Sequence, residues 1–142
     1  MLETIKQAAE NFCIHQIQEP CTTQDGITQK RTLVAYIDIE TLDKTKYRVY
    51  LASDKEFVQK VAKLFLEEDE SDDETLQDMT LEMANLIIGS AKVLAEDNQS
   101  LAFTIETPKF EKNGAFDFPV DKAQTCKIGD AELTLAIKEL DA

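Results

Sequence analysis

Six residues near the middle of the chain share a spacing of three and four: Asp78, Glu82, Asn85, Gly89, Lys92 and Glu96. On a helix with about 3.6 residues per turn, this spacing places all six in one narrow polar stripe. The stripe holds a carboxylate, Glu82, one turn from an amide, Asn85. Together they offer charge pairing and hydrogen bonding. Acids and amides at this spacing are also typical of the plain solvent face of a helix.

The polar stripe lies on the longest predicted helix, residues 73–97, which is apolar around most of its circumference. Ten residues cover its far side and flanks: Leu76, Met79, Thr80, Leu81, Met83, Ala84, Ile87, Ile88, Ala91 and Leu94. An ordinary surface helix has a broader polar face. We therefore expect a mostly buried helix that exposes a thin ribbon of polar groups.

Two strands and two helices are predicted before this helix. The first helix spans residues 2–18 and ends before Pro20. A polar connector, 20–27, leads to two alternating strands, 28–39 and 45–52, joined by a hairpin turn.

The second helix, residues 54–66, follows Ser53. With Glu56 three residues later, Ser53 has the pattern of a capping box. The acidic run 67–74 lacks the ligand spacing and central glycine of a calcium-binding loop. It is more typical of a solvated loop whose last acids favour a helix N-terminus.

After the long helix the pattern predicts a strand at residues 101–107, a strand in two parts at 115–127 and a strand at 131–139, with a turn at 98–100 and an irregular stretch from Pro108 to Gly114. Pro119 suggests that strand 115–127 is an edge or contains a bulge. The predicted fold is a single α+β domain over residues 1–142, with a largely antiparallel sheet packed against long helices.

A length argument connects Pro108 with the polar stripe. From Asn85 to Asp97 the helix advances about 18 Å, and the strand 101–107 returns about 20 Å. Pro108 should therefore arrive level with Glu82 and Asn85. Proline has a fixed φ and no N–H group, so it can stiffen the end of a strand there.

Composition excludes several classes of function. Fifteen basic and 28 acidic residues give a net charge of −13, which disfavours binding to nucleic acid or to an anionic membrane. No signal peptide or membrane-spanning run is visible. The three cysteines form no C-x-x-C pair and are expected to be reduced thiols of a cytoplasmic protein. We expect no chemistry from Cys13 or from His15, the single histidine.

The pattern Asp78-x3-Glu82-x2-Asn85-x22-Pro108 resembles the signature of the CheC/CheX/FliY family of chemotaxis phosphatases. Only one copy is present, because the first helix has no matching Glu-x-x-Asn. The chain is therefore similar to the single-motif CheX branch, and its length and element order fit that branch over nearly the whole chain.

One feature departs from the family pattern. The glycine that usually precedes the family's asparagine is absent, and Met83 and Ala84 fill the gap. Gly89 lies one turn beyond Asn85, where a missing side chain would let another protein approach closely.

The resemblance implies dephosphorylation of a phosphorylated CheY-type response regulator in chemotaxis signalling. Asn85 would orient the attacking water, and Glu82 would pair with the receiver's active-site lysine. Asp78 would tune docking and Pro108 would shape the wall of the site. No cofactor or metal is expected on this chain, because the Mg²⁺ belongs to the receiver domain.

The resemblance also implies a homodimer formed through a shared sheet. The late strand, with Val120, Ala123 and Thr125 beside Pro119, could be the edge that needs a partner. The alternative function is a non-enzymatic adaptor that binds a receiver or the flagellar switch, similar to the middle domain of FliM. An acidic domain for an unrelated partner is a third interpretation.

Overall fold

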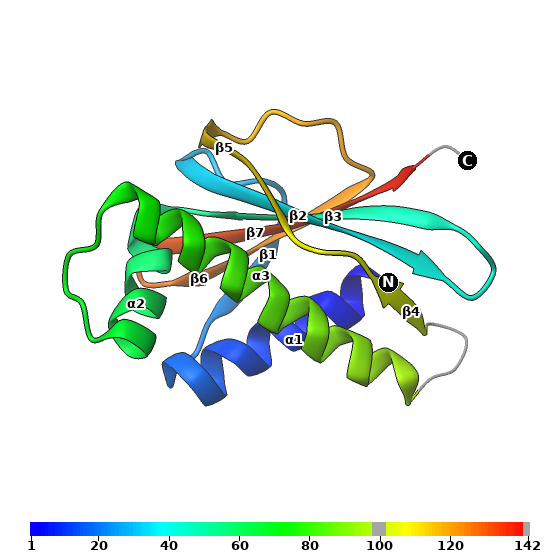
Figure 1. Cartoon of the computed structure of the whole chain (residues 1–142), viewed down its shortest axis with the longest axis horizontal. Coiled ribbons are helices and arrows are strands. Elements are labelled where there is room, and N and C mark those ends of the chain that lie inside the picture. Colours follow the sequence, from blue (N-terminus) through cyan, green and yellow to red (C-terminus); the bar gives the residue numbers. More distant parts are fainter. Residues whose placement is uncertain (98–101, 141–142) are drawn as a thin grey trace.

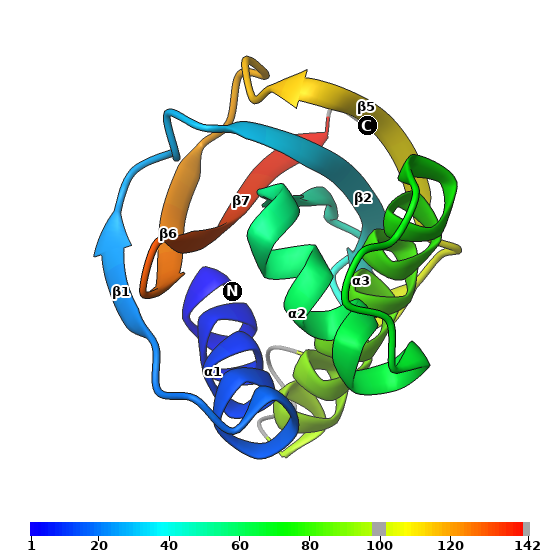
Figure 2. The same ribbon diagram turned by 90° about the vertical axis from the view of Figure 1, so that its left-hand side faces the viewer.

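The computed structural model describes residues 1–97 and 102–140. Within these ranges, a seven-stranded antiparallel sheet forms one layer, and three α-helices form the other (Figure 1). Figure 2 shows the sheet curving around the helices, which fill its concave side. The α+β prediction is confirmed. The predicted turn 98–100 lies outside the described residues, and no described helix is long and apolar enough to cross a bilayer.

The helical layer consists of α1 (Leu2–Phe12), the π-helix η1 (Cys13–Ile17), α2 (Lys55–Leu66) and α3 (Asp73–Glu96). The predicted helix over residues 2–18 is confirmed as far as Ile17, but its last part is a π-helix rather than an α-helix. The π-helix continues α1 and ends at Gln18, which is left-handed with φ 64°. π-Helices are short insertions in α-helices and often occur near functional sites.

The predicted cap of α2 was wrong by one residue. The carboxylate of Asp54 accepts a hydrogen bond from the Phe57 N–H at 2.8 Å, so Asp54 is the N-cap. Ser53 is fully buried and is still part of a strand, where it pairs with Leu33 on one side and Leu133 on the other. Because the strand continues to Ser53, the helix begins one residue later than the capping box suggested.

The strands are β1 (Thr22–Asp25), β2 (Arg31–Thr41), β3 (Lys46–Ser53), β4 (Phe103–Ile105), β5 (Lys109–Ala115), β6 (Lys122–Ile128) and β7 (Ala131–Leu140). Their order in the sheet is β1-β6-β7-β3-β2-β4, and β5 also pairs with β2. The predicted alternation in β2, β3 and β7 is confirmed, because one face of these strands enters the main core beneath the helices. These buried residues are Ala35, Ile37, Ile39, Val49, Leu51, Leu133, Leu135 and Ile137.

Three predictions about the polar segments were wrong. Residues 22–25 and 109–115 are strands rather than a connector and an irregular stretch. Of the predicted two-part strand 115–127, the first part is not a strand beyond Ala115, and the second part is β6. The segment around Pro119 connects β5 to β6 and packs Phe116 and Phe118 against Tyr50 on the outer face of the sheet. β6 is not an edge, because β1 and β7 pair with its two sides. The homodimer thus stays a prediction that rests on the family resemblance alone.

β4 and β5 lie end to end along the same side of β2, and Pro108 lies at their junction. Ile105 pairs with Ile39, and Lys109 pairs with Tyr36. The three residues that connect β4 to β5, 106–108, therefore lie opposite only two residues of β2, 37–38. Such a bulge is a site where proline is tolerated, since the regular ladder is interrupted there.

Candidate functional site

The polar stripe lies on the outer side of α3, and the opposite side of this helix is buried in the main core. Asp78, Glu82 and Asn85 are exposed, whereas Met83 and Ala84, which separate the last two, are completely buried. Buried side chains recur along the 24 residues of α3: Leu76, Thr80, Met83, Ala84, Ile87, Ile88, Ala91 and Ala95. The helix therefore holds Glu82 and Asn85 on a rigid support.

Within the described part of the chain, the side chains of Glu82 and Asn85 have no hydrogen-bond or ion-pair partner. The side-chain contacts of α3 lie elsewhere: Asp72 caps Thr75 at 2.8 Å, and Lys92 pairs with Glu96 at 3.7 Å. The carboxylate and the amide of the stripe are thus available to groups on another molecule.

Among residues 1–97 and 102–140, no neighbour gives Gly89 a steric reason to be glycine. A Cβ atom placed on it would meet nothing within 4 Å outside its own helix, and its φ is not positive. Glycine inside a helix costs about 1 kcal/mol relative to alanine. The bare backbone at Gly89 therefore leaves open space beside Asn85 at a cost to helix stability.

Pro108 lies beside the same part of α3. Two residues further along the chain, Phe110 packs against the small cluster that contains Leu76 and Met79. Two strand residues span about 7 Å, which equals four to five residues of helix. Because β5 runs antiparallel to α3 (Figure 1), this places Pro108 about level with residues 80–84, a range that includes Glu82 and ends next to Asn85.

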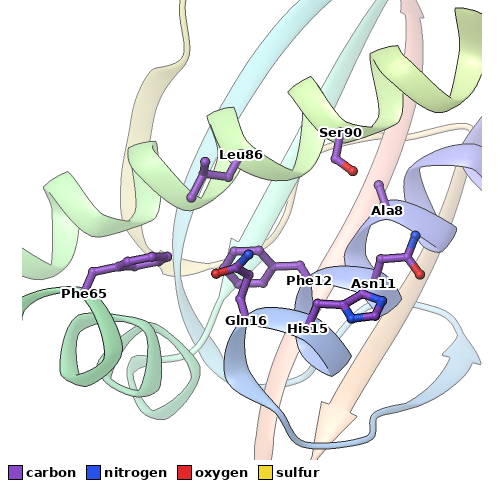
Figure 3. Close-up of a pocket in the computed structure, with 8 residues that line it drawn as sticks. All are labelled: Ala8, Asn11, Phe12, His15, Gln16, Phe65, Leu86 and Ser90. Carbon is purple, nitrogen blue, oxygen red and sulfur yellow. The ribbon is translucent and has the colours of Figure 1, made fainter.

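A groove of about 370 Å³ adjoins the polar stripe and is formed by α1, η1, α2 and α3. Figure 3 shows Leu86 and Ser90 of α3 pointing towards the helix that carries Phe12 and Gln16, with Phe65 at one end. The lining residues are Ala8, Asn11, Phe12, His15, Gln16, Phe65, Leu86 and Ser90. None of them carries a carboxylate, although the chain has 28 acidic residues.

The sequence analysis missed two apolar residues on the exposed side of α3. Leu86 is 40% exposed and Val93 is 62% exposed. At 100° per residue they lie only about 40° and 20° from Glu82 around the helix, so the helical wheel contained this signal. The exposed side of α3 is therefore not a purely polar ribbon, and its apolar side chains continue into the groove.

Comparisons with known proteins agree with this arrangement. The family model described as chemotaxis phosphatase CheX matches residues 36–128, which include the whole stripe and Pro108. No match is found among curated protein sequences.

Solved structures share the fold at low sequence identity. The chemotaxis protein CheX from Vibrio vulnificus is 16% identical with a TM-score of 0.78, and the match covers 98% of each chain. The CheX–CheY–BeF3–Mg²⁺ complex from Borrelia burgdorferi gives 16% identity and a TM-score of 0.69, with 97% of each chain covered. The FliM middle domain from Vibrio alginolyticus is more distant: its identity is 8% and its TM-score 0.57, over 97% of this chain and 92% of that chain.

The family model spans more than half of the chain, and its match includes all four positions of the motif that suggested the resemblance. The chain therefore belongs to the CheX family of chemotaxis phosphatases.

Proposed function

We propose that this protein dephosphorylates a phosphorylated CheY-type receiver domain, with Asn85 orienting the attacking water. The observation that carries the proposal is the pair formed by Glu82 and Asn85. Both are exposed, unpaired among the described residues, and one turn apart on a helix whose other side is fixed in the core. Membership of the chemotaxis phosphatase family supports the same conclusion.

The chemistry divides between the two proteins. An aspartyl phosphate on a receiver already has its metal ion and lysine supplied by that receiver, and an ordered water is the missing component. The amide of Asn85 can accept one hydrogen bond from this water and donate another, so it can fix the direction of attack. In the Borrelia burgdorferi structure, a related protein is in complex with CheY, BeF3 and Mg²⁺, which is consistent with such a division.

Glu82 is the docking residue in this proposal. Its carboxylate would pair with the receiver's active-site lysine and thereby hold Asn85 in register with the phosphate. The chain carries a net charge of −13, so long-range attraction to an acidic receiver is not expected. Local contacts must supply the affinity. Asp78, one turn before Glu82, would adjust docking, and Pro108 would form the adjacent wall.

The second candidate function is a non-enzymatic adaptor. The observation that favours it is the match of the fold to the FliM middle domain. The presence of both Glu82 and Asn85 favours the phosphatase.

Decay of phosphorylated receivers distinguishes the two functions. CheY-type receivers encoded in the same genome would be phosphorylated with a radiolabelled small-molecule donor, and loss of label followed with and without the protein. A phosphatase accelerates the loss of label at catalytic concentrations. An adaptor binds the BeF3-activated receiver but leaves the decay rate unchanged, and this result would contradict the proposal.

A further inference from the structure

Three cysteines from distant parts of the sequence lie together on the sheet side of α1. Cys13 begins η1, Cys21 directly precedes β1, and Cys126 lies in β6. Cys13 and Cys126 are completely buried in the main core, and Cys21 packs against it while remaining partly accessible. All three are free thiols.

Strand pairing brings Cys21 next to Cys126. In the β1–β6 ladder, Thr23 pairs with Cys126, and the Thr23 Oγ1 atom lies 3.7 Å from the Cys126 Sγ atom. Alternate residues of an extended chain share a face, so Cys21 points to the same side as Thr23. The Cys126 and Cys13 thiols both lie close enough to shift the pKa of the Cys21 thiol. Figure 2 shows β1 and β6 side by side with α1 against them.

The three thiols differ in reactivity. Hydrogen bonding from the Cys126 thiol, and less strongly from the Cys13 thiol, lowers the pKa of Cys21 to about 6. Burial of Cys21 acts in the opposite direction but is outweighed. Burial raises the pKa of Cys13. The bond to Cys21, followed by burial, raises the pKa of Cys126. Cys21 is therefore both the most accessible thiol and the one that most readily forms the reactive thiolate.

We propose that Cys21 and Cys126 form a peroxide-sensitive disulfide site, in which Cys21 is the attacking thiol and Cys126 the resolving thiol. The Cys21 thiolate attacks hydrogen peroxide, so an S–O bond forms, the O–O bond breaks and hydroxide leaves. Sulfur loses two electrons and the peroxide gains them. The Cys126 thiol then attacks the sulfenic acid, forming the S–S bond and releasing water.

The backbone can accommodate this bond with a small shift. Diagonal neighbours across an antiparallel pair are about 7 Å apart, close to the upper limit for a disulfide. Cys21 precedes Thr22, the first paired residue of β1, so its backbone is not held by the ladder. In a reducing compartment such a disulfide is transient and is typical of a redox sensor rather than a structural bridge.

Peptide mapping after oxidation tests the site independently of phosphatase activity. The reduced protein would be treated with hydrogen peroxide, blocked with N-ethylmaleimide and digested with trypsin without reduction. Trypsin leaves Cys13 and Cys21 together in peptide 7–30 and places Cys126 in peptide 123–127. We expect these two peptides to be linked, and dithiothreitol to separate them.

Two variants identify the sulfur atoms, and circular dichroism before oxidation confirms that both are folded. Cys13→Ser should still give the linked peptides 7–30 and 123–127, because the disulfide joins Cys21 to Cys126. Cys21→Ser, at a partly accessible position, should abolish it. The proposal is overturned if no linked pair forms in the wild type, if Cys21→Ser retains the pair, if Cys13→Ser loses it, or if the only disulfide joins two molecules.

Discussion

Asn85 and Gly89 lie one turn apart on the outer side of α3, and none of the residues that the structure describes fills the space above Gly89. The helix thus carries its least favourable residue for stability directly beside the amide that we place at the centre of the reaction. A position that costs stability without serving the fold is expected where a partner must approach closely.

Gly89→Ala should separate stability from function. Alanine fits without a clash and removes the helix penalty, so the free energy of unfolding should rise by up to about 1 kcal/mol. The added methyl group should hold the receiver away from Asn85 and raise KM for the phosphorylated receiver. Urea unfolding and phosphate-release kinetics on the same preparation check both effects. Greater stability with unchanged kinetics would show that no close approach occurs at Gly89.

Leu86→Ala should weaken receiver binding with little effect on the fold. Leu86 is 40% exposed between the stripe and the groove, and burial against a receiver would involve at least its terminal methyl groups. We expect a loss of about 1 kcal/mol, roughly fivefold in Kd for the BeF3-activated receiver, measured by calorimetry.

Leu64→Ala is the matched control for this experiment. Leu64 is 44% exposed on α2 and does not line the groove. The Leu64→Ala variant should leave the Kd for the BeF3-activated receiver unchanged. Equal losses for both variants would mean that the groove is not part of the docking surface.

The apolar framework of the fold could be predicted because its signals are local. In β2, β3 and β7, alternate residues face the main core, and α3 has one continuous buried side. The stripe and its level relative to Pro108 followed from helix and strand geometry alone. Local periodicity was sufficient wherever one face of an element is buried.

The remaining features depend on residues far apart in the sequence. β1 is entirely polar, and β5 alternates charged residues with Phe110 and Gly114, so pairing with β6 and β2 rather than local pattern makes them strands. The groove and the thiol cluster unite segments more than 70 residues apart along the chain. No local pattern predicts such neighbours.

Asp54→Ala should destabilise the protein much more than Ser53→Ala does, because Asp54 and not Ser53 caps α2. The Asp54 carboxylate accepts from Phe57 N–H at 2.8 Å and from Glu132 N–H at 3.1 Å, and it pairs with Lys30 at 3.3 Å. Losing the cap alone costs about 1 kcal/mol, and the second buried N–H adds to this. Thermal or urea unfolding measures the difference. Asp54→Asn, which keeps an acceptor, should recover part of the loss.

Alkylation of Cys21 should have an unusually low pH midpoint. Hydrogen bonds from Cys126 and Cys13 lower its pKa to about 6, while the nearby Glu10 carboxylate acts in the opposite direction. The thiolate forms as pH rises through the pKa, so the rate with iodoacetamide should be half-maximal near pH 6. An ordinary thiol would give a midpoint of about 8.5.

Cys21→Ser provides the background rate for this measurement, since the two remaining thiols are buried and have raised pKa values. Glu19 acts on the pKa of Cys13 and not on that of Cys21, so Glu19→Gln should shift the Cys21 midpoint much less than Cys126→Ser does. A wild-type rate that rises only above pH 8 would show that the hydrogen bonds to Cys21 do not stabilise its thiolate.

The kinetic parameters of Asn85→Ala and Glu82→Gln test the central claim most directly. With a cognate phosphorylated receiver, Asn85→Ala should lower kcat by about 100-fold or more, towards the receiver's own rate, because the water is no longer oriented. Glu82→Gln should chiefly raise KM, because only docking to the receiver's lysine is weakened. Full activity in Asn85→Ala would contradict the account.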